Sequence, residues 1–131
     1  MSLSPIYILE VKMKILVFGS RDWNDYNRIL DIMQRLKSKY GDIIIIEGGC
    51  KGADLLAKKA AAECRIECEE YLADWNLGKK AGPLRNQRMI DEGHPDMAVC
   101  FHNDVENSRG SKDMKNRLIK HNIPYYIIKG A

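Results

Sequence analysis

The residues with the clearest chemical meaning stand in turns rich in glycine. Residues 43–57 read IIIIEGGCKGADLLA, so that an apolar run ends at Glu47, glycines follow at 48, 49 and 52, and an alanine-rich helical pattern begins. Glycine lets backbone N–H groups approach a ligand because it has no Cβ. The first turn of a helix adds N–H groups without intrahelical acceptors and the positive end of the helix dipole. Such a turn favours an anion, above all a phosphate.

Two further turns combine glycine with arginine and serine. They are Gly19-Ser20-Arg21, after the apolar run KILVF, and Arg109-Gly110-Ser111, which opens a helical pattern. A third helix start carries Arg85 and Asn86 shortly after Gly82-Pro83. A single glycine turn also occurs merely to make a tight connection, and residues 48–52 lack the Lys-Ser/Thr of a P-loop and the G-x-G-x-x-G spacing. Several such turns together predict a phosphate-bearing ligand.

The elements that must position these turns alternate regularly. Apolar runs of strand length stand at 14–18, 43–46, 67–72, 97–101 and 124–128, and helical patterns at 26–40, 53–64, 83–92 and 111–121. Right-handed crossovers between parallel strands then favour a doubly wound arrangement. We expect an α/β, three-layer Rossmann-like fold whose five-stranded, mainly parallel sheet carries helices on both faces. In such folds ligands bind outside the carboxyl ends of the strands, where these turns lie.

Bulk properties limit the alternatives. The chain has 131 residues, which we divide into an N-terminal extension at 1–12, with Ile6–Val11 as a candidate edge strand, and a single domain at 13–131. A net charge of +3, from 21 basic and 18 acidic residues, favours neither nucleic acid nor a membrane as partner. No apolar run approaches a membrane span and no signal peptide is visible, so we expect a cytoplasmic protein. Four cysteines without a Cys-x-x-Cys pair predict reduced thiols and no metal site.

Four motifs in order then resemble a known family. GSRDW, EGGCKGAD, ADW…GKKAGPLRNQRM and SRGSKDM resemble motifs of the SLOG superfamily, and within it the YspA/YpsA-related branch, over about residues 14–128. That superfamily includes the LOG phosphoribohydrolases, which cleave the base–ribose bond of nucleoside 5′-monophosphates, the DNA-processing protein DprA, and domains that sense NAD-derived signals. The resemblance implies a pocket for a nucleoside phosphate or an ADP-ribose-like or NAD-like molecule, with no required cofactor. It also implies a homo-oligomer, most simply a dimer.

The predicted ligand-binding residues follow from the turns and the resemblance together. They are Gly19, Ser20, Arg21, Gly48, Gly49, Gly52, Asp54, Trp75, Arg85, Asn86, Arg109, Gly110 and Ser111. Asp54 either accepts a ribose hydroxyl or only complements the dipole of its helix. Trp75 either stacks on a base or covers the rim of the pocket. Arg85, in register with an arginine of the LOG enzymes, is expected to contact phosphate or ribose.

The expected chemistry depends on one acidic position. Counted from Gly110-Ser111, the glutamate that supports cleavage in LOG enzymes corresponds to Met114, and Asp113 stands one residue early. A shift of one residue rotates a helical side chain by about 100°, which directs the Asp113 carboxylate elsewhere. A binding module, acting as a sensor or sequestering protein, is therefore favoured. A LOG-like hydrolase using Asp74, Asp113 or Glu47 remains an alternative, as does DprA-like binding of single-stranded DNA.

Overall fold

The computed structural model describes residues 11–130. The helices and strands are β1 (Met13–Gly19), α1 (Tyr26–Tyr40), β2 (Ile43–Glu47), α2 (Ala53–Glu63), β3 (Glu67–Glu70), η1 (Trp75–Lys80), α3 (Ala81–Asp91), β4 (Met97–Phe101), η2 (Val105–Asn107), α4 (Arg109–Lys120) and β5 (Tyr125–Ile128), where η marks a 3₁₀ segment. Of the candidate edge strand Ile6–Val11, all but Val11 lies outside the described residues, and Val11 is exposed and in no strand. The division between extension and domain at residue 13 stays a prediction.

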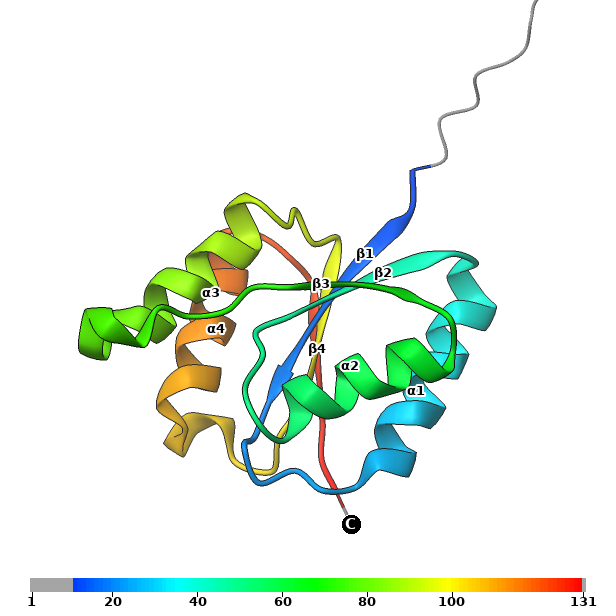
Figure 1. Cartoon of the computed structure of the whole chain (residues 1–131), viewed down its shortest axis with the longest axis horizontal. Helices are drawn as coiled ribbons and strands as arrows, with labels where there is room; N and C mark the ends of the chain where they lie inside the picture. Colours follow the sequence, from blue (N-terminus) through cyan, green and yellow to red (C-terminus); the bar gives the residue numbers. More distant parts are fainter. Residues whose placement is uncertain (1–10, 131) are drawn as a thin grey trace, which may run out of the picture.

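The sheet has the order β3-β2-β1-β4-β5, and every described pairing is parallel. The chain therefore runs outward from β1 to β3 and then returns to the other side of β1 with β4. Helices α1 and α2 cover one face of the sheet and α3 and α4 the other (Figure 1). This confirms the predicted α/β Rossmann-like fold, and it places the switch in strand order between β1 and β4.

The central strand β1 joins two cores. Ile15 and Val17 pack on the α1 and α2 side, whereas Leu16 and Phe18 pack on the α3 and α4 side. This alternation follows from the period of two in a strand, and it explains why a central parallel strand is apolar at consecutive positions. Two packed faces hold the carboxyl end of β1 rigidly, and the turn at Gly19 follows directly from it.

Two helix starts differ from the sequence prediction. Residues 73–82, which the sequence patterns assign to no strand or helix, contain the 3₁₀ segment η1, which is interrupted at Gly78 with φ of 68°. Helix α4 begins at Arg109 rather than at Ser111, because Ser108 adopts an extended conformation and caps it. Arg109 and Gly110 consequently belong to the first turn of the helix. Within residues 11–130, no helix combines the length and apolar character that crossing a bilayer requires.

Candidate functional site

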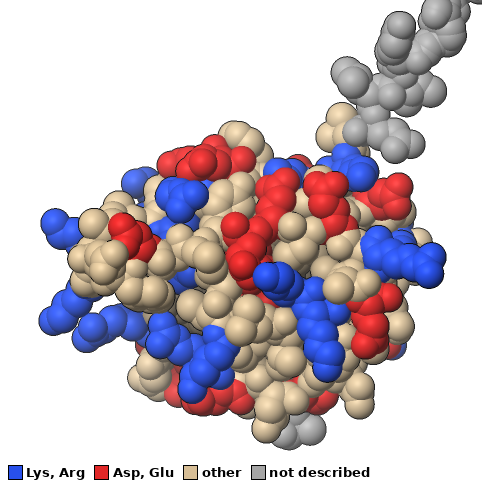
Figure 2. Space-filling view, in the orientation of Figure 1, with Lys and Arg blue, Asp and Glu red and all other residues tan. Residues whose placement is uncertain are grey.

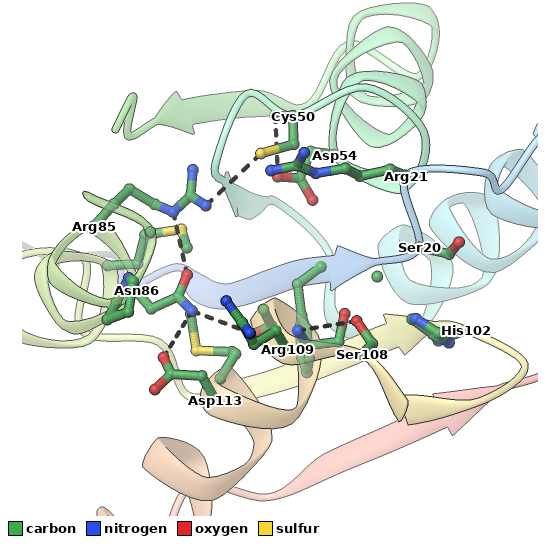
Figure 3. Close-up of a pocket in the computed structure, with 18 of the residues that line it drawn as sticks. Ser20, Arg21, Cys50, Asp54, Arg85, Asn86, His102, Ser108, Arg109 and Asp113 are labelled. Carbon is green, nitrogen blue, oxygen red and sulfur yellow. Dashed lines mark hydrogen bonds between the residues drawn. The ribbon is translucent and has the colours of Figure 1, made fainter. Parts of the chain in front are cut away.

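A cavity of about 640 Å³ lies outside the carboxyl ends of β1 and β4. The turn after β1 and the first turns of α2, α3 and α4 surround it, and His102 borders it just after β4 (Figure 3). Of the predicted ligand-binding residues, all but Gly48, Gly49 and Gly52 line this cavity. It lies at the switch in strand order, which is the usual ligand position in open α/β sheets.

The first turn of α4 faces the cavity with free backbone donors. The Ser108 hydroxyl accepts a hydrogen bond from the Ser111 amide at 3.4 Å. Within residues 11–130, the amides of Arg109 and Gly110 have no hydrogen-bond acceptor. A Cβ built on Gly110 would meet no atom within 4 Å, so the space above this turn is open. Packing does not require glycine at this position. Close approach of a ligand to the backbone amides would require it, because a Cβ could stand in the way.

The glycine loop at residues 48–52 is different, because carboxyl groups of the chain itself accept hydrogen bonds from two of its amides. Glu47 Oε1 accepts a hydrogen bond from the Gly49 amide at 2.7 Å. Asp54 Oδ2 accepts one from the Cys50 amide at 3.2 Å. The hydrogen bonds that the sequence pattern assigned to an anion in this loop are thus already accepted in part by Glu47 and Asp54.

Close packing explains the glycines of this loop. A Cβ on Gly52, which has a φ of +83°, would clash with the carbonyl oxygen of Ser20 and the backbone of Arg21. A Cβ on Gly48 would lie 2.7 Å from Nη1 of Arg85. The loop can therefore pack this closely against the turn after β1 and against Arg85 only because Gly48 and Gly52 have no side chain. As ligand contacts, Gly48, Gly49 and Gly52 stay predictions that this geometry does not favour.

Arg85 is buried beside this loop and its donors have partners within the chain. Nη1 donates to the carbonyl oxygen of Gly48 at 2.5 Å, and Nη2 lies 3.7 Å from Sγ of Cys50. Nε donates to the side-chain oxygen of Asn86 at 3.1 Å. The guanidinium group borders the cavity, but its contacts with Gly48 and Cys50 hold the glycine loop in place. Its predicted contact with phosphate or ribose remains untested.

Asp113 also lines the cavity, although the sequence comparison directed its carboxylate elsewhere. Oδ2 accepts hydrogen bonds from Nδ2 of Asn86 at 3.0 Å and from Nε of Arg117 at 2.8 Å. Asn86 and Arg117 therefore hold the carboxylate at the wall of the cavity, next to the buried side chain of Met114.

Two arginines complete the charge of the cavity. Arg21 and Arg109 both line it, and within the described residues neither has a carboxylate within 4.0 Å of its side-chain nitrogens. The Arg21 guanidinium lies 5.8 Å from the ring centre of Trp75, which is 56% exposed and forms part of the cavity wall. An anion in the cavity would thus meet positive charge from two elements.

Comparison with known proteins identifies the family of the chain and supports its fold. The model of a protein family described as "YspA, cpYpsA-related SLOG family" matches residues 13–78, which is half of the chain. The chain belongs to this SLOG family. The matched range runs from β1 through most of η1 and includes the glycine loop, Asp54 and Trp75. The α4 turn lies beyond it.

The fold of this SLOG chain is similar to that of a solved structure, the DNA processing protein A (DprA) from Streptococcus pneumoniae. The TM-score is 0.71 at 18% sequence identity, over 92% of this chain and 51% of that one. The SLOG chain thus spans about half the length of DprA, and at this identity the likeness shows the fold alone. No curated protein sequence matches the chain significantly.

The other two predicted catalytic acids of the SLOG chain lie outside the cavity. Asp74 is exposed and caps η1 by accepting a hydrogen bond from the Asn76 amide at 3.1 Å. Glu47 is fully buried beneath the loop, beside Cys68 and Glu70, and burial raises its pKa well above the usual carboxyl range. Neither residue is among those that line the cavity, and their catalytic roles stay predictions.

Two titratable groups in the cavity have shifted pKa values. Burial raises the pKa of Asp54 to about 6, although the Cys50 amide and the charge of Arg85 oppose the shift. Burial lowers the pKa of His102, whose Nδ1 accepts a hydrogen bond from the Asp104 amide at 2.8 Å. The His102 ring is therefore neutral near pH 7, with its proton on Nε2. His102 is not among the predicted site residues, because a single histidine without a visible partner in the sequence is more often structural, although it stands directly after β4.

Among the residues that the structure describes, no group of three or more His, Cys, Asp or Glu side chains is placed to hold a metal ion. The polar groups of the cavity instead include amides, hydroxyls, arginines and the carboxyl groups of Asp22, Asp54 and Asp113. This set can bind an anion and can exchange hydrogen bonds with neutral polar groups.

Proposed function

We propose that the chain binds a nucleotide or nucleotide-derived small molecule in this cavity, as a sensor or sequestering protein. The open first turn of α4, where the amides of Arg109 and Gly110 have no acceptor among residues 11–130, is the observation that carries the proposal. Backbone N–H groups and the helix dipole both favour a phosphate at such a position. The Arg109 side chain adds charge-assisted hydrogen bonds.

The size and charge of the surroundings support a small anionic ligand. The cavity volume of about 640 Å³ falls within the usual range for small-molecule sites. On the face shown in Figure 2, Lys and Arg side chains gather at the left edge, which η1, α3 and the start of α4 form in Figure 1. Positive charge beside a binding site raises the local concentration of anions.

Thermal-shift measurements test the proposal. Nucleoside monophosphates, NAD and ADP-ribose should raise the melting temperature of the wild-type protein, and the corresponding nucleosides should not. Ligand at 100 times its dissociation constant adds about 2.7 kcal/mol to the free energy of unfolding.

A pair of variants locates the effect. Gly110→Val places a branched side chain over the open amides and should abolish the shift. Asn116→Val, an exposed position on the same helix, introduces the same side chain away from the cavity and should retain it. A shift that survives Gly110→Val, or that phosphate-free nucleosides produce equally, contradicts the proposal.

A hydrolase of the LOG type is the second candidate, because Asp113 and Asp54 are among the carboxyl groups that line the same cavity. Burial raises the pKa of Asp54 to about 6. A carboxyl group with a raised pKa is suited to exchange protons near neutral pH. Chromatography of nucleoside 5′-monophosphates incubated with the protein decides between the candidates. Release of free base that Asp113→Asn removes supports the hydrolase, and binding without turnover supports the sensor.

Two proposals concern larger partners. We propose a symmetric homodimer through α2 or α3, on which Leu55 and Leu84 are exposed, and light scattering at tens of micromolar tests it. Binding of single-stranded DNA has only the fold likeness to DprA in its favour, and the net charge of +3 does not support it. A gel-shift titration at two salt concentrations tests this alternative.

A further inference from the structure

The first turn of α4 and the side chain of Asp54 offer a ligand different hydrogen-bonding groups. The first turn of α4 offers donors, namely its open amides, the Arg109 side chain and the buried Ser111 hydroxyl. The α2 side offers Asp54, whose side chain Figure 3 shows beside Arg21, across the cavity from Arg109 and Ser108. Asp54 is only 7% exposed, so solvent has little access to its carboxyl group.

We propose that Asp54 accepts a hydrogen bond from a sugar hydroxyl of the ligand, whose phosphate lies at the first turn of α4. The cavity would then select ribosyl phosphates with free 2′- or 3′-hydroxyls over their deoxy forms. This inference rests on the proposed function, because it assigns a second contact to a ligand already bound by its phosphate.

The charges around Asp54 determine which chemical group fits it. Arg85 and Arg21 both lie close enough to lower its pKa, so positive charge is already supplied from the protein. A cationic ligand group would meet two guanidinium groups, and a second phosphate would meet a buried carboxyl group. A neutral donor avoids both repulsions, and a hydroxyl is the neutral donor that a ribosyl phosphate carries.

The carboxyl group is also held in place before any ligand binds. The Cys50 amide donates to Oδ2, and a Cβ on Gly48 would lie 3.0 Å from the same oxygen. Gly48 therefore lets the loop backbone approach Asp54 closely, and Arg85 fixes that loop through the Gly48 carbonyl oxygen. A group that is already oriented loses little conformational entropy on binding, which increases its contribution to selectivity.

Calorimetric titration with matched nucleotides tests the inference. The probes are the 5′-monophosphates of adenosine, guanosine, cytidine and uridine, each paired with its 2′,3′-dideoxy analogue. We expect the wild-type protein to bind at least one ribonucleotide about tenfold or more tightly than its dideoxy partner, as a hydrogen bond to a charged group predicts. Asp54→Ala should remove this preference, and Gly110→Val should weaken both members of the pair alike.

The outcomes separate the two hypotheses. Equal binding of both members by the wild-type protein overturns the hydroxyl contact and leaves the proposed function standing. Binding of neither member of any pair overturns this inference, and the proposed function falls with it if NAD and ADP-ribose also fail to raise the melting temperature. The wild-type comparison needs no variant, so a destabilising effect of Asp54→Ala cannot obscure it. Asp54→Asn, which keeps the shape and an acceptor oxygen, should retain part of the preference.

Discussion

Two helix starts in this molecule look alike in sequence and differ in structure. The loop at residues 48–52 precedes α2, and the segment Ser108–Ser111 opens α4, and both combine glycine with polar residues. In the first, Glu47 and Asp54 accept hydrogen bonds from the loop amides. In the second, the amides of Arg109 and Gly110 have no acceptor within residues 11–130. A glycine turn before a helix is thus available to an anion only where the chain's own carboxyl groups leave it open.

The glycines themselves show the same difference. Gly52 has a positive φ and touches the backbone of the turn after β1, whereas Gly110 has open space where its side chain would stand. The first glycine is required by packing, and the second leaves access to a helix end. Substitution of Gly52 should therefore lower stability, and substitution of Gly110 by a bulky residue should weaken ligand binding.

The largest expected effect is on the packed loop. Gly52→Ala forces an L-residue into a φ of +83° and drives its Cβ against the Ser20 carbonyl oxygen. We expect the free energy of unfolding to fall by about 2–4 kcal/mol, from backbone strain and overpacking together. Urea denaturation followed by circular dichroism measures it. An unchanged midpoint would mean that the loop is not packed as described.

Arg85 tests what holds the loop. Arg85→Met keeps much of the buried side-chain volume and removes the donors to the Gly48 carbonyl oxygen and the Asn86 side chain. We expect a loss of about 1.5–3 kcal/mol in the free energy of unfolding, because buried acceptors lose a charged partner. Arg88→Met, at an exposed position on the same helix, is the control and should change stability little. Equal effects of both substitutions would contradict the positioning role.

The raised pKa of Glu47, which lies beneath the glycine loop, makes the stability of the protein depend on pH. Burial, and a hydrogen bond with Glu70, raise the pKa of Glu47 from 4.5 to about 8 in the folded protein. Between these values the folded chain keeps a proton that the unfolded chain loses, so stability falls as pH rises through this range. The slope from this group is at most about 1.4 kcal/mol per pH unit.

Glu47→Gln isolates that contribution, because glutamine cannot ionise and Asp54, Glu70 and the other acids remain. Chemical denaturation at several pH values between 4.5 and 8 should show a shallower decline for the variant than for the wild-type protein. Parallel curves would show that Glu47 is not held protonated beneath the loop.

The smallest expected effect is at the open turn. Gly110→Ala adds a methyl group where no atom lies within 4 Å and removes conformational freedom from the unfolded chain. We expect stability to rise by about 0.4–1 kcal/mol, opposite in sign to Gly52→Ala. Differential scanning calorimetry measures it. A fall in the melting temperature would show that the turn is more crowded than the structure indicates.

The sequence predicted the fold better than the site, for a physical reason. Strand and helix periods are local, so the five strands and four helices followed from short stretches such as KILVF and IIII. The cavity also brings together Arg21, Arg109 and Asn86, whose contacts with a ligand stay predictions.

It was harder to predict which groups accept hydrogen bonds from the loop amides. Whether a carboxyl group reaches an amide depends on side-chain direction rather than on residue type. The pattern EGGCKGAD is compatible both with an empty anion site and with one filled by Glu47 and Asp54. Ser108 caps α4 and so determines where its open amides lie. The sequence prediction missed this cap because Ser111 also suits a helix start.

The central claim, that the α4 turn and not the glycine loop receives the phosphate, is tested most directly by nuclear magnetic resonance. In a ¹H–¹⁵N titration with a nucleoside 5′-monophosphate that stabilises the protein, the amides of Arg109 and Gly110 should shift strongly, because they gain an acceptor. The amides of Gly49 and Cys50, which already donate to Glu47 and Asp54, should shift little. Strong shifts at Gly49 and Cys50 with none at Arg109 and Gly110 would contradict the account.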